Sequence, residues 1–189
     1  MSICQSYRLL SKDEFQKFLA NPDWAEKFLY GNFFNEDFEE SEEYDDSCFP
    51  EEELAKQGKY VDIQKEWQAL HFLLTGKIEF HQTAKILPLL DSVIMGGHDT
   101  PYEATYGYYR YFTSEETQQI ADMLANIEAI ALKELHKDKF SQATNLYANQ
   151  SPDKWNEEYW GYILDYFDDV KELFIKAARE NYIVLVSSD

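Results

Sequence analysis

Residues 61–76, "VDIQKEWQALHFLLTG", decide the fold that we expect for this chain. Apolar and aromatic side chains recur in this stretch at the spacing of one helical face. The residues on that face are Ile63, Trp67, Leu70, His71 and Leu74. Asp62 stands at a suitable N-cap position, and Gly76 suits the left-handed residue that follows a helix. The stretch therefore predicts a helix between these two residues, more deeply buried than most.

The rest of the chain predicts further helices and a small sheet. Capping boxes at residues 11–14 and 113–116 each open a helix. The expected helices cover residues 13–20, 22–31, 51–57, 88–97, 115–135, 138–148 and 151–181. Alternating or aromatic patterns predict strands near the N-terminus, in the aromatic segment 98–112 and at the C-terminus. We therefore expect an α+β fold, a helix-rich single domain over residues 1–189 with a small sheet formed by N-terminal, central aromatic and C-terminal strands.

Acidic residues are concentrated in one segment. The formal net charge is −19, and residues 35–53 contain eleven Asp or Glu and no Lys or Arg. The rest of the chain has 25 acidic and 17 basic residues, a net charge of −8. We interpret residues 35–57 as an acidic, exposed insertion. The charge disfavours nucleic acid and anionic membranes as direct partners and favours a basic protein.

Apolar stretches and cysteines predict the compartment. No window approaches the ~20 apolar residues that a membrane helix needs, and we find no signal peptide in the first residues. Cys4 and Cys48 are far apart and form no CxxC or metal-finger spacing. We expect a soluble, cytoplasmic protein with reduced thiols.

The stretch at residues 61–76 also resembles the hallmark of the YfbM-like family, the bacterial domain of unknown function DUF1877. Its pattern is an Asp, a Trp a few residues later, and then Leu-His-x-Leu-Thr-Gly, which Asp62, Trp67 and residues 70–76 match. The segment "YGYYRYFT" at residues 106–113 is similar to the family's Tyr-Gly-x-x-Arg-Tyr-Leu-Thr. The resemblance covers most of the chain and departs from the pattern at residues 35–60. It implies a small α+β protein and supplies no catalytic residues.

The candidate site residues come from two segments. His71 has a side chain suited to acid–base chemistry, and Trp67 and Thr75 lie one helical turn on either side of it. The alternative is a buried, neutral imidazole that is hydrogen-bonded to a carbonyl or a tyrosine. Arg110 could grip an anionic group in a pocket lined by tyrosines such as Tyr109. The alternative for that segment is a packing seam whose arginine pairs with a carboxylate.

Complete motifs for metal, cofactor or nucleotide chemistry are absent from the sequence. The four histidines form no HExxH or i, i+4 pair, and no stretch reproduces an EF-hand loop. There is no GxxxxGK[ST], GxGxxG or GxSxG motif. We therefore expect neither a metal nor a cofactor.

Two functional hypotheses follow. The first is a non-enzymatic interaction protein whose acidic surface engages a basic partner, for example in an antitoxin-like or immunity-like role against a basic toxin or nuclease. The second is an enzyme or small-ligand-binding protein with a pocket around His71, Trp67 and Arg110. The position of His71 relative to solvent distinguishes them.

Overall fold

The stretch at residues 61–76 divides into a strand and a helix, so the prediction of one continuous helix is wrong. The computed structural model describes residues 3–31, 50–77, 89–140, 146 and 156–189. In it, β2 covers Tyr60–Gln64 and α4 covers Trp67–Thr75. Gln64 has a φ of 49°, a left-handed conformation that turns the chain out of the strand. The helix ends at Gly76 as predicted, with a φ of 65°.

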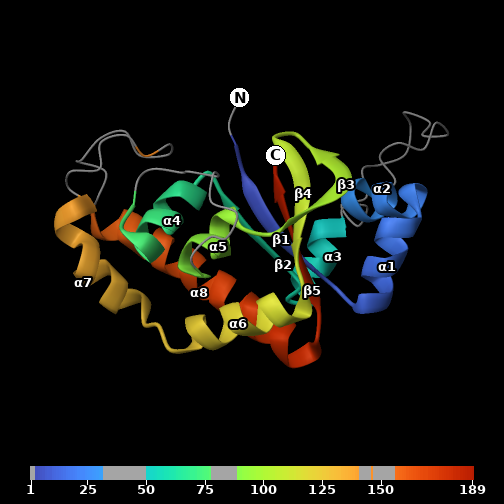
Figure 1. Cartoon of the computed structure of the whole chain (residues 1–189). Coiled ribbons are helices and arrows are strands. Elements are labelled where there is room, and N and C mark those ends of the chain that lie inside the picture. The colour runs from blue at the N-terminus through green and yellow to red at the C-terminus, as the bar shows by residue number, and fades with distance from the viewer. Residues whose placement is uncertain (1–2, 32–49, 78–88, 141–145, 147–155) are drawn as a thin grey trace.

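A five-stranded antiparallel sheet forms the centre of the molecule (Figure 1). Its strands are β1 (Gln5–Leu10), β2, β3 (His98–Ala104), β4 (Gly107–Phe112) and β5 (Ile183–Ser188). Their order is β2-β1-β5-β4-β3, and every neighbouring pair is antiparallel. The predicted helix-rich α+β fold is confirmed, including the N-terminal, aromatic and C-terminal strands. The sequence patterns missed β2, and they did not predict that the aromatic segment forms two paired strands, β3 and β4.

The helices follow their local sequence signals closely. They are α1 (Lys12–Ala20), α2 (Pro22–Tyr30), α3 (Pro50–Lys56), α4, α5 (Leu89–Met95), α6 (Ser114–Ala125), α7 (Ala129–Phe140) and α8 (Glu157–Glu180). Both predicted capping boxes are present, at Ser11 and at Thr113. Residues 32–49, which hold most of the acidic insertion, lie outside the described residues, and its last part is α3.

One predicted helix is in fact two. The expected helix over residues 115–135 breaks between α6 and α7, where Asn126 ends α6. The side-chain amide of Asn126 donates to the carbonyl oxygen of Asp122 at 2.7 Å. Such local bonds of Asn compete with the helical ladder and favour a helix end. Asp138, expected to cap a helix over residues 138–148, lies inside α7, and most of that predicted helix falls outside the described residues.

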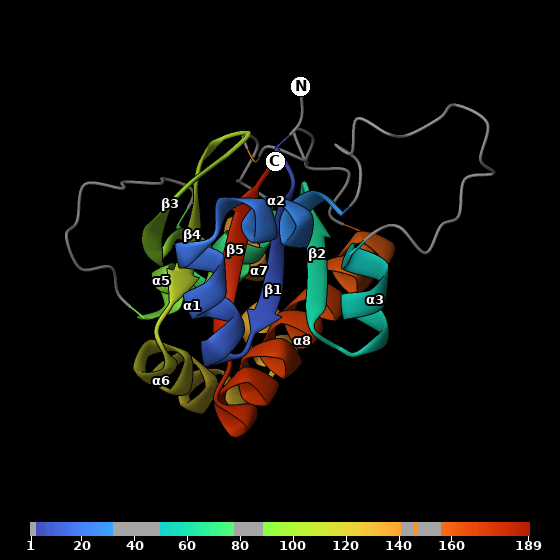
Figure 2. The ribbon, with the colours of Figure 1, turned by 90° about the vertical axis from the view of Figure 1, so that its right-hand side faces the viewer.

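Helices cover both faces of the sheet (Figures 1 and 2). On one face, α1 and α2 enclose a cluster with Phe18 and Tyr109 at its centre. On the other face, α4, α5, α6 and α8 enclose the larger cluster, which includes Tyr7, Leu70 and Phe174. Alternate residues of the three inner strands, β1, β5 and β4, point into the two clusters, as the period of two in a pleated sheet requires.

The long C-terminal helix α8 packs its apolar stripe against this larger cluster. Most of the predicted stripe is buried, including Ile163, Phe167 and Phe174. Tyr162 lies outside the buried part of this stripe and is 55% exposed. In the described part of the chain, no helix is both long and apolar enough to span a membrane.

Candidate functional site

His71 lies inside the protein, next to an acidic and a basic side chain. It is 1% exposed, and its Nε2 lies 3.5 Å from Oδ1 of Asp91. The ammonium group of Lys77 contacts both oxygens of that carboxylate, at 3.2 and 3.1 Å. Burial lowers the pKa of His71 more than the carboxylate of Asp91 raises it. The imidazole is therefore neutral near pH 7 and enclosed, which matches the structural alternative for this residue.

This arrangement predicts a loss of stability on mild acidification. Because burial depresses the pKa of His71 in the folded state, the unfolded chain binds more protons once the pH falls below the ordinary value of 6.5. His136 contributes with the same sign, since burial and Lys139 lower its pKa. We expect the free energy of unfolding, measured by urea denaturation, to decrease between pH 7.5 and pH 6. The decrease should be smaller in His71→Gln, and an equal slope in both proteins would contradict the prediction.

Arg110 extends from β4 to the C-terminal end of α5. Its Nη1 donates to the carbonyl oxygen of Gly96 at 2.6 Å, and its Nη2 donates to that of Ile94 at 3.4 Å. Two side chains of β1 reach the same end of the helix: Gln5 donates to the carbonyl of Ile94, and the Tyr7 hydroxyl donates to that of Val93. These carbonyls lack partners within a helix, so the strands cap α5 from outside.

A pocket of about 340 Å³ lies beside this capping network. The residues around it that matter here are Gln5, Trp67, Met95, Asp99, Tyr108 and Arg110, and we call it the Arg110 pocket. It also touches Ile3 and Ser188, so it lies at the end of the sheet where both termini are placed (Figure 1). Trp67 is partly buried, since it lines this pocket and also packs against the larger cluster.

The Arg110 pocket brings together two of the five candidate residues, Trp67 and Arg110. Tyr109 is 1% exposed on the opposite face of the sheet, where its hydroxyl donates to that of Tyr30 at 3.2 Å. Thr75 donates to the carbonyl oxygen of His71 at 2.8 Å and does not line the pocket. The sequence analysis missed Tyr108, which shares a strand face with Arg110 two residues away.

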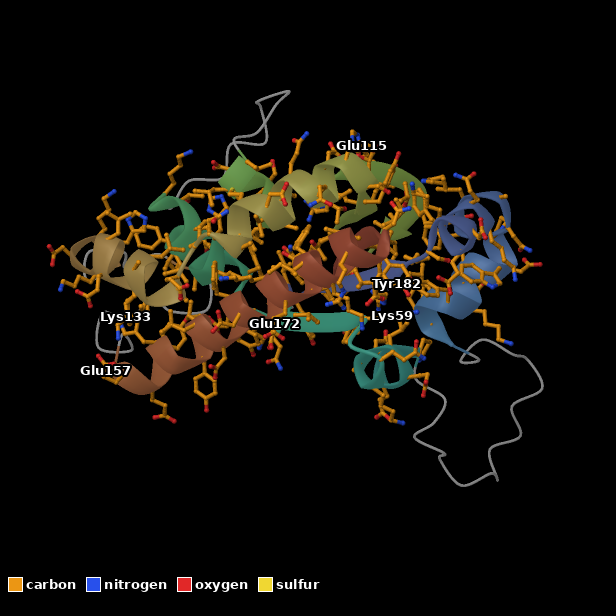
Figure 3. The ribbon with its side chains drawn as sticks, turned by 90° about the horizontal axis from the view of Figure 1, so that it is seen from below. Lys59, Glu115, Lys133, Glu157, Glu172 and Tyr182 are labelled. Carbon is orange, nitrogen blue, oxygen red and sulfur yellow. The ribbon has the colours of Figure 1, made fainter. Side chains whose placement is uncertain are left out.

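A second hollow, of about 590 Å³, lies between α8 and β2. Residues lining it include Tyr60, Asp62, Asp169, Glu172, Lys176 and Arg179, and we call it the α8–β2 groove. Figure 3 shows Glu172 on α8 close to β2. Partial burial raises the pKa of Asp62 above its ordinary value, and burial together with nearby carboxylates does the same for Asp169. The groove therefore carries three carboxylates beside two basic side chains, and the pKa of two of these acids is raised.

Acidic residues on α8 are spaced so that their side chains repel one another. Asp169 follows Asp165 by four residues and precedes Glu172 by three, so all three lie on one helical face. Asp168 lies beside them, and its pKa is also raised by burial and by carboxylates including Glu172. Like charges at these spacings destabilise a helix by roughly 0.2–0.5 kcal/mol per pair. The sequence keeps them at a cost in stability.

We expect Asp169→Asn to raise the free energy of unfolding at pH 7 by about 0.5 kcal/mol, because it removes like-charge pairs. The pKa of Asp169 is raised in the folded state, so protonation favours folding, and the gain should vanish as the pH approaches 3.8. Urea denaturation at several pH values measures both effects. Glu134→Gln is the control, because Lys137 lowers the pKa of Glu134 and its neutralisation should bring no gain. A gain of the same size in the control would contradict the explanation.

The acids of the described residues are not arranged as a metal site. Within the described ranges, no group of three or more His, Cys, Asp or Glu side chains is arranged to hold a metal ion.

The antiparallel sheet with helices on both faces defines a helix-rich α+β protein with a pocket at the end of the sheet that holds the termini. The chain belongs to the family described as "Domain of unknown function (DUF1877)", whose profile matches residues 1–187. This confirms the resemblance seen in the sequence.

Comparison with solved structures supports the same fold. The chain is similar to the structure titled "The Crystal Structure of a Protein of Unknown Function YfbM from Escherichia coli", with a TM-score of 0.62 and 13% sequence identity. The match covers 98% of this chain and 99% of the other chain. No curated protein matches the sequence.

Proposed function

We propose that this protein is a non-enzymatic interaction module that binds a Lys- or Arg-rich segment of a basic protein in the α8–β2 groove. A basic toxin or nuclease, held in an antitoxin-like or immunity-like manner, is a partner of this kind. The observation that carries the proposal is the set of three carboxylates that line the groove, Asp62, Asp169 and Glu172, where burial and neighbouring acids raise the pKa of Asp169.

The charge of the groove complements a cationic segment. In the free protein, Asp165, Asp169 and Glu172 repel one another, and an ammonium or guanidinium group between them would relieve that repulsion. The two basic side chains of the groove form hydrogen bonds within the chain, and a carboxylate offsets the charge of one of them, Arg179. Lys176 donates to the carbonyl oxygen of Gln57, and Arg179 donates to Glu180. The whole chain, with a net charge of −19, would attract the same partner from a distance.

Tyrosines beside the acids suit the same partner. Tyr162 is 55% exposed on α8, three residues before Asp165. The Tyr159 hydroxyl donates to the carboxylate of Glu66, the residue just before α4. Exposed aromatic rings beside carboxylates contribute cation–π contacts to Lys and Arg side chains, worth about 0.5–1 kcal/mol each at exposed sites.

Binding of a peptide of defined sequence to the purified protein tests the proposal. A fluorescent deca-lysine peptide is titrated with the protein at low and at physiological ionic strength, and the anisotropy is recorded. Wild type is compared with a groove variant, Asp165→Asn/Asp169→Asn/Glu172→Gln. A matched variant, Glu26→Gln/Glu103→Gln/Glu115→Gln, removes the same number of exposed charges elsewhere; Figure 3 shows Glu115 on α6.

We expect the groove variant to bind the peptide about tenfold more weakly than the matched variant, with affinity falling as salt rises. Equal weakening in both variants would mean that net charge alone attracts the peptide, and the groove would be rejected as the site. Absence of binding to wild type would reject the proposal as a whole. A third variant, in which the acids of residues 36–46 are replaced by Asn and Gln, should retain most of the binding, and its loss there would place the contact outside the groove.

A further inference from the structure

We propose that the Arg110 pocket binds a small organic carboxylate whose flat, apolar body lies against Trp67 and Tyr108. This site is separate from the α8–β2 groove, because the two hollows share no lining residue. The proposal therefore stands independently of the proposed function. It gives the pocket hypothesis a ligand class and leaves His71 out of the site.

The guanidinium group of Arg110 lacks an ion-pair partner in the described part of the chain. Its contacts there are the carbonyl oxygens of Gly96 and Ile94. Burial lowers the pKa of Arg110 more than the charge of Asp99, its partner across β3 and β4, raises it. Among the described residues, Arg110 hydrogen-bonds only to carbonyl oxygens, which is unusual for an arginine in a chain with 36 acidic and 17 basic residues. Asp99 is close enough to influence its pKa but forms no ion pair with it there, so a bound anion would supply a direct counter-charge.

The donors of Arg110 remain available for such an anion. A guanidinium group carries more N–H groups than two hydrogen bonds consume, and its planar fork matches the two oxygens of a carboxylate. The polar lining also includes Asp99 and Gln5, and Gln5 is 2% exposed and donates from its amide to Tyr7 and Ile94. This part of the pocket lining is thus polar, and hydrogen bonds hold its side chains in place.

Aromatic side chains also line the pocket. Tyr106, in the β3–β4 turn, is 37% exposed, and Tyr108, the second residue of β4, is 45% exposed. A side chain built at Gly107 would meet no atom within 4 Å, so the backbone there is open. Together with Trp67, these rings offer flat apolar surface above a buried polar floor, the combination typical of small-molecule sites.

Size and charge decide the ligand class. A volume of about 340 Å³ lies at the small end of the range of roughly 300–1,000 Å³ for ligand sites, so a one- or two-ring molecule fits and a dinucleotide does not. The strongly acidic exterior repels polyanions more than monoanions. A single carboxylate therefore suits this pocket better than a polyphosphate.

The test uses matched probes that differ only in the charged group. Phenylacetate and indole-3-acetate are titrated into ¹⁵N-labelled protein, beside phenylacetamide, indole-3-acetamide and phenethylamine. The resonances of the Trp67 indole N–H and the Gly107 amide report binding in the pocket. The same titrations are made with Arg110→Lys and Tyr108→Ala. Tyr162→Ala, an exposed tyrosine replaced on α8, is the control.

We expect saturable shifts with a carboxylate probe and about tenfold weaker binding of its amide. Tyr108→Ala should weaken carboxylate binding. If Arg110→Lys does not fold, the comparison of Tyr108→Ala with wild type tests the proposal. Tyr162→Ala and the groove variant should bind the carboxylate as wild type does. Equal binding of acid, amide and amine would overturn the proposal, as would equal losses in Tyr108→Ala and Tyr162→Ala. Absence of binding by both carboxylates would also overturn it.

Discussion

Replacing Phe174 by Ala is expected to lower the free energy of unfolding by about 4 kcal/mol. The side chain is 0% exposed, and its ring lies 6.1 Å from that of Tyr7 and 5.5 Å from that of Phe112, measured between centroids. One ring on α8 thus contacts both β1 and β4. The smaller side chain would leave a cavity among residues that the sheet and helices hold in place, so little relaxation can fill it.

Urea denaturation followed by far-ultraviolet circular dichroism measures this loss. Tyr162→Ala is the matched control, because Tyr162 lies on the same helix and is 55% exposed. Its replacement should change the free energy of unfolding by about 0.5 kcal/mol or less. A loss below about 1.5 kcal/mol for Phe174→Ala, or equal losses in the two variants, would contradict the packing of α8 against the sheet.

Strong local signals explain why much of the fold could be predicted. In the capping boxes at Ser11 and Thr113, each side chain accepts from a backbone N–H three residues later, so neighbours in sequence suffice to form them. The apolar stripe of α8 runs over many turns, which leaves little ambiguity about its period. The left-handed end of α4 could be predicted because it depends on a single residue, Gly76.

The error at residues 61–76 arose where two periods fit the same residues. Ile63 falls on the helical face of the stretch, yet it also fits the alternation of a short strand. Pairing decides the matter: Asp62 and Gln64 face Ser6 and Gln5 of β1, far away in sequence. A single-sequence pattern contains no information about such a long-range partner, so β2 could not be recognised.

The candidate site could be predicted only in part for a related reason. Trp67 and Arg110 were selected for their chemistry, and the structure places both at one pocket. Tyr109 was selected with them, but neighbouring residues in a strand point to opposite faces, so Tyr108 lies beside Arg110 instead. The capping of α5 by Arg110 depends on how a helix packs against the sheet. Nothing local in residues 106–112 signals that contact.

The acidic surface shows the same limit. The charge of residues 35–53 is evident in the sequence, and it led us to expect a basic partner. The α8–β2 groove joins Asp62 to Asp169 and Glu172, which are more than a hundred residues apart in the chain. Each acid alone resembles an ordinary surface charge. Only packing of β2 against α8 makes them one feature.

The second large effect is expected for Arg110→Met, which should lower the free energy of unfolding by about 2 kcal/mol. Methionine fills a similar volume but donates no hydrogen bond, so the carbonyl oxygen of Gly96 loses its partner. Ile94 keeps the bond from Gln5 at 3.0 Å, which limits the damage at that carbonyl. The positive charge at the C-terminal end of α5 is lost as well. Release of a buried guanidinium from its desolvation offsets part of this loss.

The location of the loss distinguishes capping from a general effect of charge. Arg110→Lys retains the charge but has a single nitrogen, so it should fall between wild type and Arg110→Met. Arg179→Met removes an exposed arginine and should change the free energy of unfolding by about 0.5 kcal/mol or less. Hydrogen exchange should accelerate in α5 and remain unchanged in α1, which lies on the other face of the sheet. If Arg110→Met matches Arg179→Met, or if exchange in α5 is unaffected, Arg110 does not hold this helix against the sheet.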